Sequence, residues 1–104
     1  MTSLSINVNI PLRIYFNYIE RIFMIPPRIE SVKALDDFWL KIIYKNGEIK
    51  KYNMQKNLKY NFYKNLNNIS YFKLVKSVDT TVEWPNGEDL DPNDLYENSI
   101  SYNK

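Results

Sequence analysis

Carboxylates are concentrated near the end of this 104-residue chain, in a segment that also contains a turn and the start of a helix. Side-chain oxygens this close in sequence can bind a hard cation such as Ca²⁺ or Mg²⁺. They can also attract a basic protein partner and guide its approach. The segment contains Glu83, Glu88, Asp89, Asp91, Asp94 and Glu97. Two hypotheses therefore compete for it, a metal site and a protein-binding surface.

The metal hypothesis would make Glu88, Asp89 and Asp91 the oxygen ligands of a metal-dependent hydrolase. Their spacing departs from the calcium loop of an EF-hand, and Pro92 interrupts it. We therefore expect no metal, no cofactor and no enzymatic activity.

The composition excludes most other catalytic chemistry, because the chain contains neither cysteine nor histidine. Thiolate nucleophiles, histidine-based triads, His-ligated zinc and disulfides are unavailable. The absence of cysteine fits a reducing cytoplasm, where we expect the protein to reside. No run of about 18 apolar residues occurs, so we expect no membrane helix.

The protein-binding hypothesis depends on which carboxylates have a structural explanation. Asp91 can cap a helix, Pro92 suits its first position, and Asp94 in the first turn suits the helix dipole. In this interpretation, Glu88 and Asp89 neither cap a helix nor pack against the core. The candidate partner-binding residues are therefore Glu88, Asp89 and Asp94, although these charges could serve solubility alone. Replacing Glu88 or Asp89 by lysine should leave the fold unaltered and remove the partner.

The charges divide the chain into parts of opposite sign. Residues 28–76 contain eleven basic and four acidic residues, a net charge of +7, whereas residues 77–104 contain seven acidic and one basic residue, a net charge of −6. Two oppositely charged faces are expected, which could pair within a monomer or between copies. The basic part supports an alternative function, contact with nucleic-acid phosphates. Its candidate residues are Lys41, Lys45, Lys50 and Lys59, for which an ordinary solvated surface is the simpler interpretation.

Asn46 and Gly47 predict a β-hairpin, because this pair favours a type I′ turn with positive φ at both residues. A two-residue loop would pair Tyr44 with Ile49 and set the register of both strands. The core face would then carry Leu40, Ile42, Tyr44 and Ile49, and the opposite face would carry Lys41, Lys45, Glu48, Lys50 and Tyr52.

The remaining elements complete an α+β pattern. Residues 28–35 predict a first strand, and residues 72–84 predict a last strand or a hairpin that bends near Asp79. Residues 54–71 predict one amphipathic helix, whose asparagines favour a break near Asn68. The buried stripe of that helix would carry Leu58, Phe62, Leu66 and Ile69. A turn comes after Trp84, with positive φ at Gly87. A short helix should then end near Asn98.

The first 23 residues differ in pattern from the rest of the chain. Their alternating apolar residues could form an edge strand. Alternatively, residues 1–23 are an extension outside the domain, and Met24 is the natural start of the protein. The predicted organisation is this extension, one domain over residues 24–99, and a tail over residues 100–104.

The segment Trp84-Pro85-Asn86-Gly87-Glu88-Asp89-Leu90-Asp91-Pro92, with Leu95-Tyr96 and the earlier Asn46-Gly47-Glu48, resembles the bacterial domain of unknown function family 2442. Tyr52-Asn53 departs from the more usual Tyr-Asp of that family. The resemblance implies an antiparallel sheet of roughly three to five strands with one main helix and a short C-terminal helix. It also implies pairing with a small toxin-like protein of domain of unknown function family 4160. The expected function is therefore a non-enzymatic, antitoxin-like interaction module.

Overall fold

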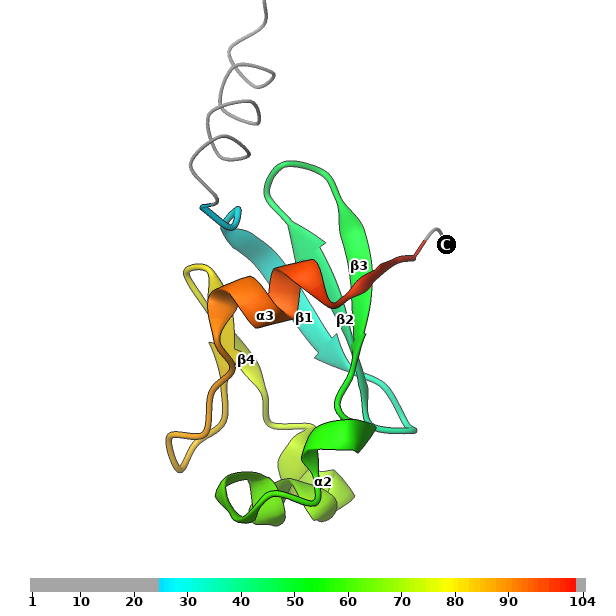
Figure 1. The fold of residues 1–104 in the computed structure, drawn as a ribbon, viewed down its shortest axis with the longest axis vertical. Coiled ribbons are helices and arrows are strands. Elements are labelled where there is room, and N and C mark those ends of the chain that lie inside the picture. The colour runs from blue at the N-terminus through cyan, green and yellow to red at the C-terminus, as the bar shows by residue number, and fades with distance from the viewer. Residues whose placement is uncertain (1–24, 103–104) are drawn as a thin grey trace, which may run out of the picture.

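A computed structural model describes residues 25–102 of the chain, so the predicted extension at residues 1–23 and the candidate start at Met24 lie outside the described residues (Figure 1). The fold is α+β, as predicted. Its elements in chain order are β1 (Ile29–Ala34), β2 (Trp39–Tyr44), β3 (Ile49–Asn53), the 3₁₀ helices η1 (Gln55–Asn57) and η2 (Asn61–Asn67), α2 (Ile69–Phe72), β4 (Lys76–Val78), β5 (Thr81–Glu83), α3 (Pro92–Glu97) and β6 (Ile100–Ser101).

Two antiparallel sheets form the framework of residues 25–102. The larger sheet has the strand order β1-β2-β3-β6, and β4 and β5 form a separate two-stranded ribbon. The ribbon lies beside β1, where the Ile29 N–H donates to the carbonyl of Asp79 at 2.8 Å. Helix α3 crosses one face of the larger sheet, and η1, η2 and α2 gather at one end (Figure 1). We call the sheet face toward α3 the inner face and the opposite one the outer face.

The β2–β3 hairpin forms where it was predicted, but the prediction of a type I′ turn was wrong. The Tyr44 N–H donates to the carbonyl of Glu48, and the Gly47 N–H donates to the carbonyl of Tyr44, both at 2.9 Å. Only Gly47 of the loop has a positive φ, 97°. The loop therefore has three residues and ends in a left-handed glycine. The Asn46 side chain stabilises it by accepting the Glu48 N–H at 3.0 Å.

This extra loop residue shifts the predicted pairing by one position. Ile43, not Tyr44, pairs with Ile49, and Tyr52 lies opposite Leu40. Because side chains alternate between faces, the shift moves Tyr52 to the inner face, where it is only 1 % exposed, and moves Ile49 to the outer face. The predicted core assignments of Leu40, Ile42 and Tyr44 are confirmed.

The single helix predicted over residues 54–71 was wrong. The chain instead forms η1, η2 and the one-turn helix α2, separated by extended backbone at Tyr60 and Asn68. Asparagine competes with helical hydrogen bonding, and Asn68 does so directly by accepting the N–H groups of Ser70 and Tyr71. The predicted break at Asn68 is thereby confirmed. Phe62, expected on the buried stripe, is 57 % exposed.

The residues after β4 match the prediction closely. The β4–β5 hairpin bends at Asp79, whose φ is 56°. Trp84 is buried, and its indole N–H donates to the carbonyl of Phe72 at 2.8 Å. The Asp91 carboxylate caps α3 by accepting the Asp94 N–H at 3.0 Å. The core comprises Ile29, Leu40, Ile42, Tyr44, Tyr52, Met54, Leu66, Phe72, Val82, Trp84, Leu90 and Leu95.

The end of the described chain joins the larger sheet. Residues 100–104 were assigned to a tail, but Ile100 and Ser101 form β6 and pair with Lys51 and Lys50 of β3. None of the helices within residues 25–102 has the length and apolar character that a membrane span requires.

Candidate functional site

Glu88 is buried, with 5 % of its surface exposed, so the prediction that it neither caps nor packs was wrong. The Tyr71 hydroxyl donates to one carboxylate oxygen at 2.7 Å, and the Asn65 side-chain amide donates to the other at 3.3 Å. The carbonyl of Glu88 also accepts the Trp84 N–H at 2.8 Å. Glu88 therefore joins the turn after β5 to η2 and α2, and it is not available to a partner.

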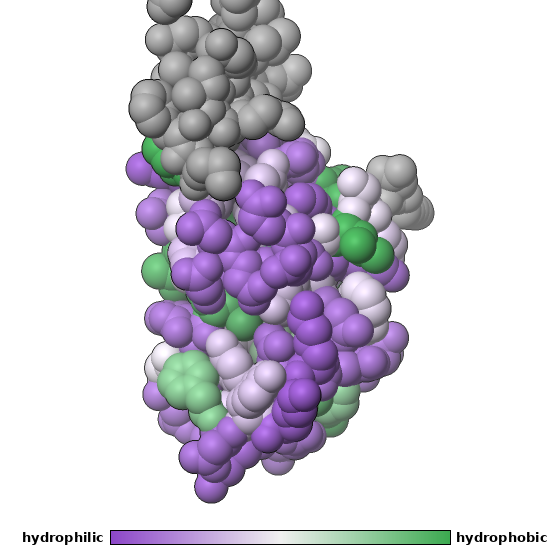
Figure 2. Space-filling view, in the orientation of Figure 1, coloured by the Kyte–Doolittle hydropathy of each residue, from purple (hydrophilic) through white to green (hydrophobic). Residues whose placement is uncertain are grey.

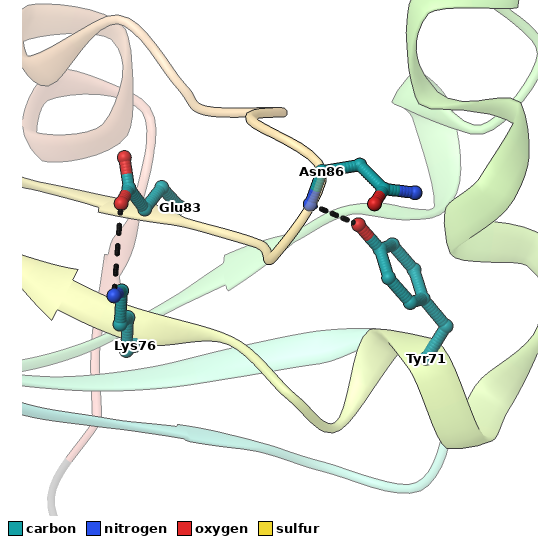
Figure 3. A network of polar contacts seen from close by, with 4 residues as sticks. All are labelled: Tyr71, Lys76, Glu83 and Asn86. Atoms are coloured by element: carbon teal, nitrogen blue, oxygen red, sulfur yellow. Dashed lines mark hydrogen bonds and ion pairs between the residues drawn. The ribbon is translucent and has the colours of Figure 1, made fainter.

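The environment of Glu88 favours its charged form. Burial by itself would raise the pKa of this carboxyl, but hydrogen bonds from Tyr71, from its own backbone N–H and from Asn65 outweigh burial and lower the pKa. The pKa of Tyr71 is raised by burial and by its hydrogen bond to Glu88. The Tyr71 hydroxyl also accepts the Asn86 N–H at 2.7 Å, which ties the turn to α2 (Figure 3).

Asp94 is also used within the fold. The Tyr52 hydroxyl donates to its Oδ2 at 2.7 Å, and the Asn98 side-chain amide donates to its Oδ1. Burial and the hydrogen bond to Asp94 raise the pKa of Tyr52 to about 12. Asp94 thus connects α3 to β3, and both of its oxygens have partners inside the domain. The contact between Tyr52 and Asp94 could have been predicted from the sequence only with the correct hairpin register, because that register places Tyr52 on the inner face.

Asp89 is the predicted partner-binding residue that stays exposed. Its backbone carbonyl accepts the Tyr63 hydroxyl at 2.8 Å, and the Tyr63 ring meets the Phe62 ring edge-on with centroids 4.8 Å apart. Phe62 and the nearby Tyr60 are 57 % and 54 % exposed. We call Tyr60, Phe62, Tyr63 and Asp89 the aromatic–acidic surface. The sequence predicted exposed positions for Tyr60 and Tyr63, but the helix predicted over residues 54–71 placed Phe62 on its buried stripe.

The other carboxylates of the segment have separate surroundings. Asp91 caps α3, and Glu83 lies 3.9 Å from the Lys76 ammonium across the β4–β5 ribbon (Figure 3). Glu97 is exposed at the end of α3. Within residues 25–102, no three acidic side chains are grouped so that they could hold a metal ion.

Comparison with known families gives one match. A family model described as protein of unknown function (DUF2442) matches residues 29–101, which is more than two thirds of the chain. The chain belongs to this family. Comparisons with curated proteins and with solved structures found no match.

The DUF2442 match begins with β1 and ends with β6, so it includes both sheets and α3. The residues that carried the resemblance have structural roles here. Trp84 anchors the core, Gly87 makes the turn with a φ of 100°, Glu88 binds Tyr71, and Asp91 caps α3. This motif therefore identifies the fold of the DUF2442 domain. Among the charged residues of the motif, Asp89 is the one whose carboxylate has no structural role in the contacts described.

The predicted basic residues do not share one surface. Lys50 lies on the inner face, where its ammonium donates to the carbonyl of Tyr96 at 2.9 Å and sits 3.9 Å from the centre of the Tyr96 ring. Lys41 lies on the outer face, Lys45 is exposed in the hairpin loop, and Lys59 lies between η1 and η2 beside Tyr60. The prediction that Lys41, Lys45 and Lys50 share one face of the hairpin was wrong, because the one-residue register shift turns Lys50 to the opposite face.

The outer face of the DUF2442 sheet carries a different row of lysines. Lys33 lies directly opposite Lys41, and Lys41 lies directly opposite Lys51. Sequence reasoning missed Lys33 and Lys51, because only the correct register aligns lysines from three strands.

Among the described residues of the inner face, Tyr44 carries an unsatisfied polar group. Its hydroxyl is buried and has no hydrogen-bond partner within residues 25–102. Its ring meets the Tyr96 ring edge-on with centroids 5.1 Å apart. Burial, followed by the nearby Tyr96 and Glu48, raises the pKa of Tyr44. The Tyr44 hydroxyl thus lowers the stability of the core.

Proposed function

We propose that this DUF2442 domain is a non-enzymatic protein-interaction module that acts as an antitoxin-like partner of a small basic protein. The observation that carries the proposal is the contiguity of the aromatic–acidic surface. Phe62 contacts Tyr63, and Tyr63 donates to the backbone of Asp89. The exposed Phe62 ring and the exposed Asp89 carboxylate are thus connected through the half-buried Tyr63, whose N–H donates to the carbonyl of the exposed Tyr60, just before η2, at 2.9 Å.

Exposed aromatic rings suit the centre of a protein interface. An aromatic side chain buries about 150–250 Å² when fully covered, so a ring that is more than half exposed has about 100 Å² left to bury. At about 25 cal/mol per Å², covering Phe62 and Tyr60 would contribute about 2.5 kcal/mol each. Aromatic residues are also enriched among those that dominate binding energy.

Charge supports a basic partner. Asp89 is exposed and belongs to the acidic C-terminal part of the sequence. Asp91 and Glu97 are exposed at the two ends of α3, and no ion pair is found for either of them or for Asp89 among residues 25–102. The face of the molecule that carries α3 is largely hydrophilic (Figure 2). Asp89, which lies beside the aromatic rings, would help to orient a cationic protein, and the charges of Asp91 and Glu97 would add to the attraction that accelerates its approach.

The partner we propose is a small toxin-like protein of domain of unknown function family 4160, encoded beside this chain. Co-expression of the full chain with its neighbouring gene product, after nuclease treatment, should yield a complex that elutes as one species. The double substitution Phe62→Ser with Tyr60→Ser should abolish the complex, and Asp89→Lys should weaken it. Both variants should keep the melting temperature of the wild type, since the altered side chains are exposed.

Two controls match these substitutions at a distance from the proposed surface. Ile100→Ser removes an apolar side chain of similar exposure, 52 %, from β6. Glu30→Lys reverses an exposed charge on β1. Both controls should retain the complex. The proposal is wrong if the two proteins elute separately, or if the complex survives loss of both aromatic rings.

A further inference from the structure

The outer face of the larger sheet carries three lysines in one row across β1, β2 and β3. Lys33 pairs with Lys41, and Lys41 pairs with Lys51, so each pair lies directly across neighbouring strands. Like charges in directly opposite positions destabilise a sheet. The row therefore lowers the stability of the fold, and a role in folding does not explain it.

Among residues 25–102, no carboxylate forms an ion pair with these three lysines. The paired positions on one side of the row are Ser31, Ile43 and Ile49, and those on the other side are Trp39 and Asn53. The row itself ends at Ile100 of β6. Within residues 25–102, the ion pairs found involve other lysines and Arg28. The outer face thus presents three positive charges among neutral side chains, and none of these side chains is buried.

Aromatic rings flank the row instead. The Lys51 ammonium lies 4.8 Å from the centre of the Trp39 ring and 5.0 Å from the centre of the Tyr102 ring. The Lys41 ammonium lies 5.6 Å from the centre of the same Tyr102 ring. These distances allow cation–π attraction, which holds the ammonium groups over the rings. A base stacked on either ring would bring its phosphate close to Lys41 or Lys51.

From this arrangement we infer that the outer face binds single-stranded nucleic acid, with Lys33, Lys41 and Lys51 contacting phosphates and Trp39 and Tyr102 stacking on bases. Neighbouring strands lie about 4.8 Å apart, so the row is about 10 Å long. That length suits the backbone of a short single strand whose bases are turned toward the rings. A duplex would keep its bases stacked on one another and leave the rings unused. An acidic protein could neutralise the lysines but would gain no base stacking.

The contacts are expected to be tolerant of sequence. Lysine is a compact point charge without the planar fork that lets arginine recognise guanine, and ring stacking is available to every base. This inference does not depend on the aromatic–acidic surface, whose residues come from η2, the residue before it and the turn after β5. The two surfaces can be disabled separately.

The test measures binding of the full chain to fluorescein-labelled single strands of about 12 nucleotides, RNA and DNA, by fluorescence anisotropy. Three phosphate contacts predict a slope of about −2 in log affinity against log salt, which is roughly an 18-fold loss between about 50 mM and about 200 mM salt. The triple substitution Lys33→Gln, Lys41→Gln, Lys51→Gln should abolish the slope and lower affinity at least about 10-fold. Trp39→Ala should lower affinity roughly 5-fold to 150-fold with an unchanged slope.

The matched control is the triple substitution Lys56→Gln, Lys59→Gln, Lys64→Gln, which removes the same charge from exposed residues outside the sheet and should leave the affinity within about 3-fold. The outer-face triple variant should melt no lower than the wild type, because the lysines of the row repel one another. The inference is overturned if wild-type protein shows no binding in low salt or if the two triple variants bind alike. Tighter binding of a duplex of the same length, or equal binding of polyglutamate, would also overturn it.

Discussion

Replacement of Glu88 distinguishes a buried structural carboxylate from an exposed binding residue. We expect Glu88→Lys and Glu88→Ala to destabilise the domain strongly, whereas Asp89→Lys, at the next position, should leave stability within about 0.5 kcal/mol. The reason is that Glu88 is buried and accepts two side-chain hydrogen bonds, while Asp89 is exposed.

The magnitude can be worked out from the partners of the carboxylate. A hydrogen bond to a charged group contributes about 1.5–3 kcal/mol. The bond from Tyr71 is short, 2.7 Å, whereas the bond from Asn65 is 3.3 Å and contributes less. Glu88→Ala should therefore cost about 2–3 kcal/mol. Glu88→Lys should cost at least as much, because it places an ammonium group beside two donors. Glu88→Gln keeps the shape and one acceptor, so it should cost only about 1 kcal/mol.

Thermal unfolding monitored by circular dichroism at pH 7 measures these differences. For a domain of this size, each kcal/mol lowers the melting temperature by about 4–8 °C, so Glu88→Ala should melt about 10–20 °C below the wild type. Asp89→Lys serves as the matched charge reversal and should melt within a few degrees of it. If Glu88→Lys and Asp89→Lys melt together near the wild-type temperature, Glu88 is not buried and the structural role derived for it is refuted.

Three further outcomes are expected. Tyr44→Phe should leave the free energy of unfolding unchanged or raise it by up to about 1 kcal/mol, because it removes a buried hydroxyl that has no partner in the described part of the chain; a lower free energy of unfolding in urea would show that the hydroxyl is bonded. The pKa of Glu88 is lowered in the folded state from an ordinary value of 4.5, so its contribution is present above that value and is lost as pH falls through the lowered pKa. Glu88→Gln should therefore flatten the decline in stability on acidification, and equal acid slopes for the two proteins would contradict this. Gly47→Ala should cost about 1–2 kcal/mol through backbone strain alone, since φ is 97° and a Cβ atom there would meet nothing within 4 Å; an unchanged urea midpoint would mean that the loop can adopt another turn.

Local features of the chain were predictable because neighbouring residues determine them. The cap at Asp91, the positive φ of Gly87 and the hairpin at Asn46 each depend on contacts within a few positions. The break at Asn68 belongs to the same group, because its side chain binds backbone groups two and three residues ahead. The family match also rests on sequence alone, since its most specific motif is a contiguous segment.

The candidate surfaces could not be predicted in the same way. A loop longer by one residue reversed the faces of Lys50 and Tyr52, and it brought Lys33, Lys41 and Lys51 into line. Hairpin loops of two and three residues are both common, and an Asn-Gly pair can form part of either. The choice between them therefore rests on packing across the whole sheet.

The sequence by itself determined the fold class, the positions of the turns and caps, and the separation of basic and acidic residues along the chain. The tertiary structure decided which charges remain available for binding. Glu88 and Asp94 find hydroxyl donors 17 and 42 residues away in the chain, and Asp89 finds none for its carboxylate among the contacts described. Such pairings depend on how segments that are distant in the sequence pack together, so a local sequence pattern cannot predict them.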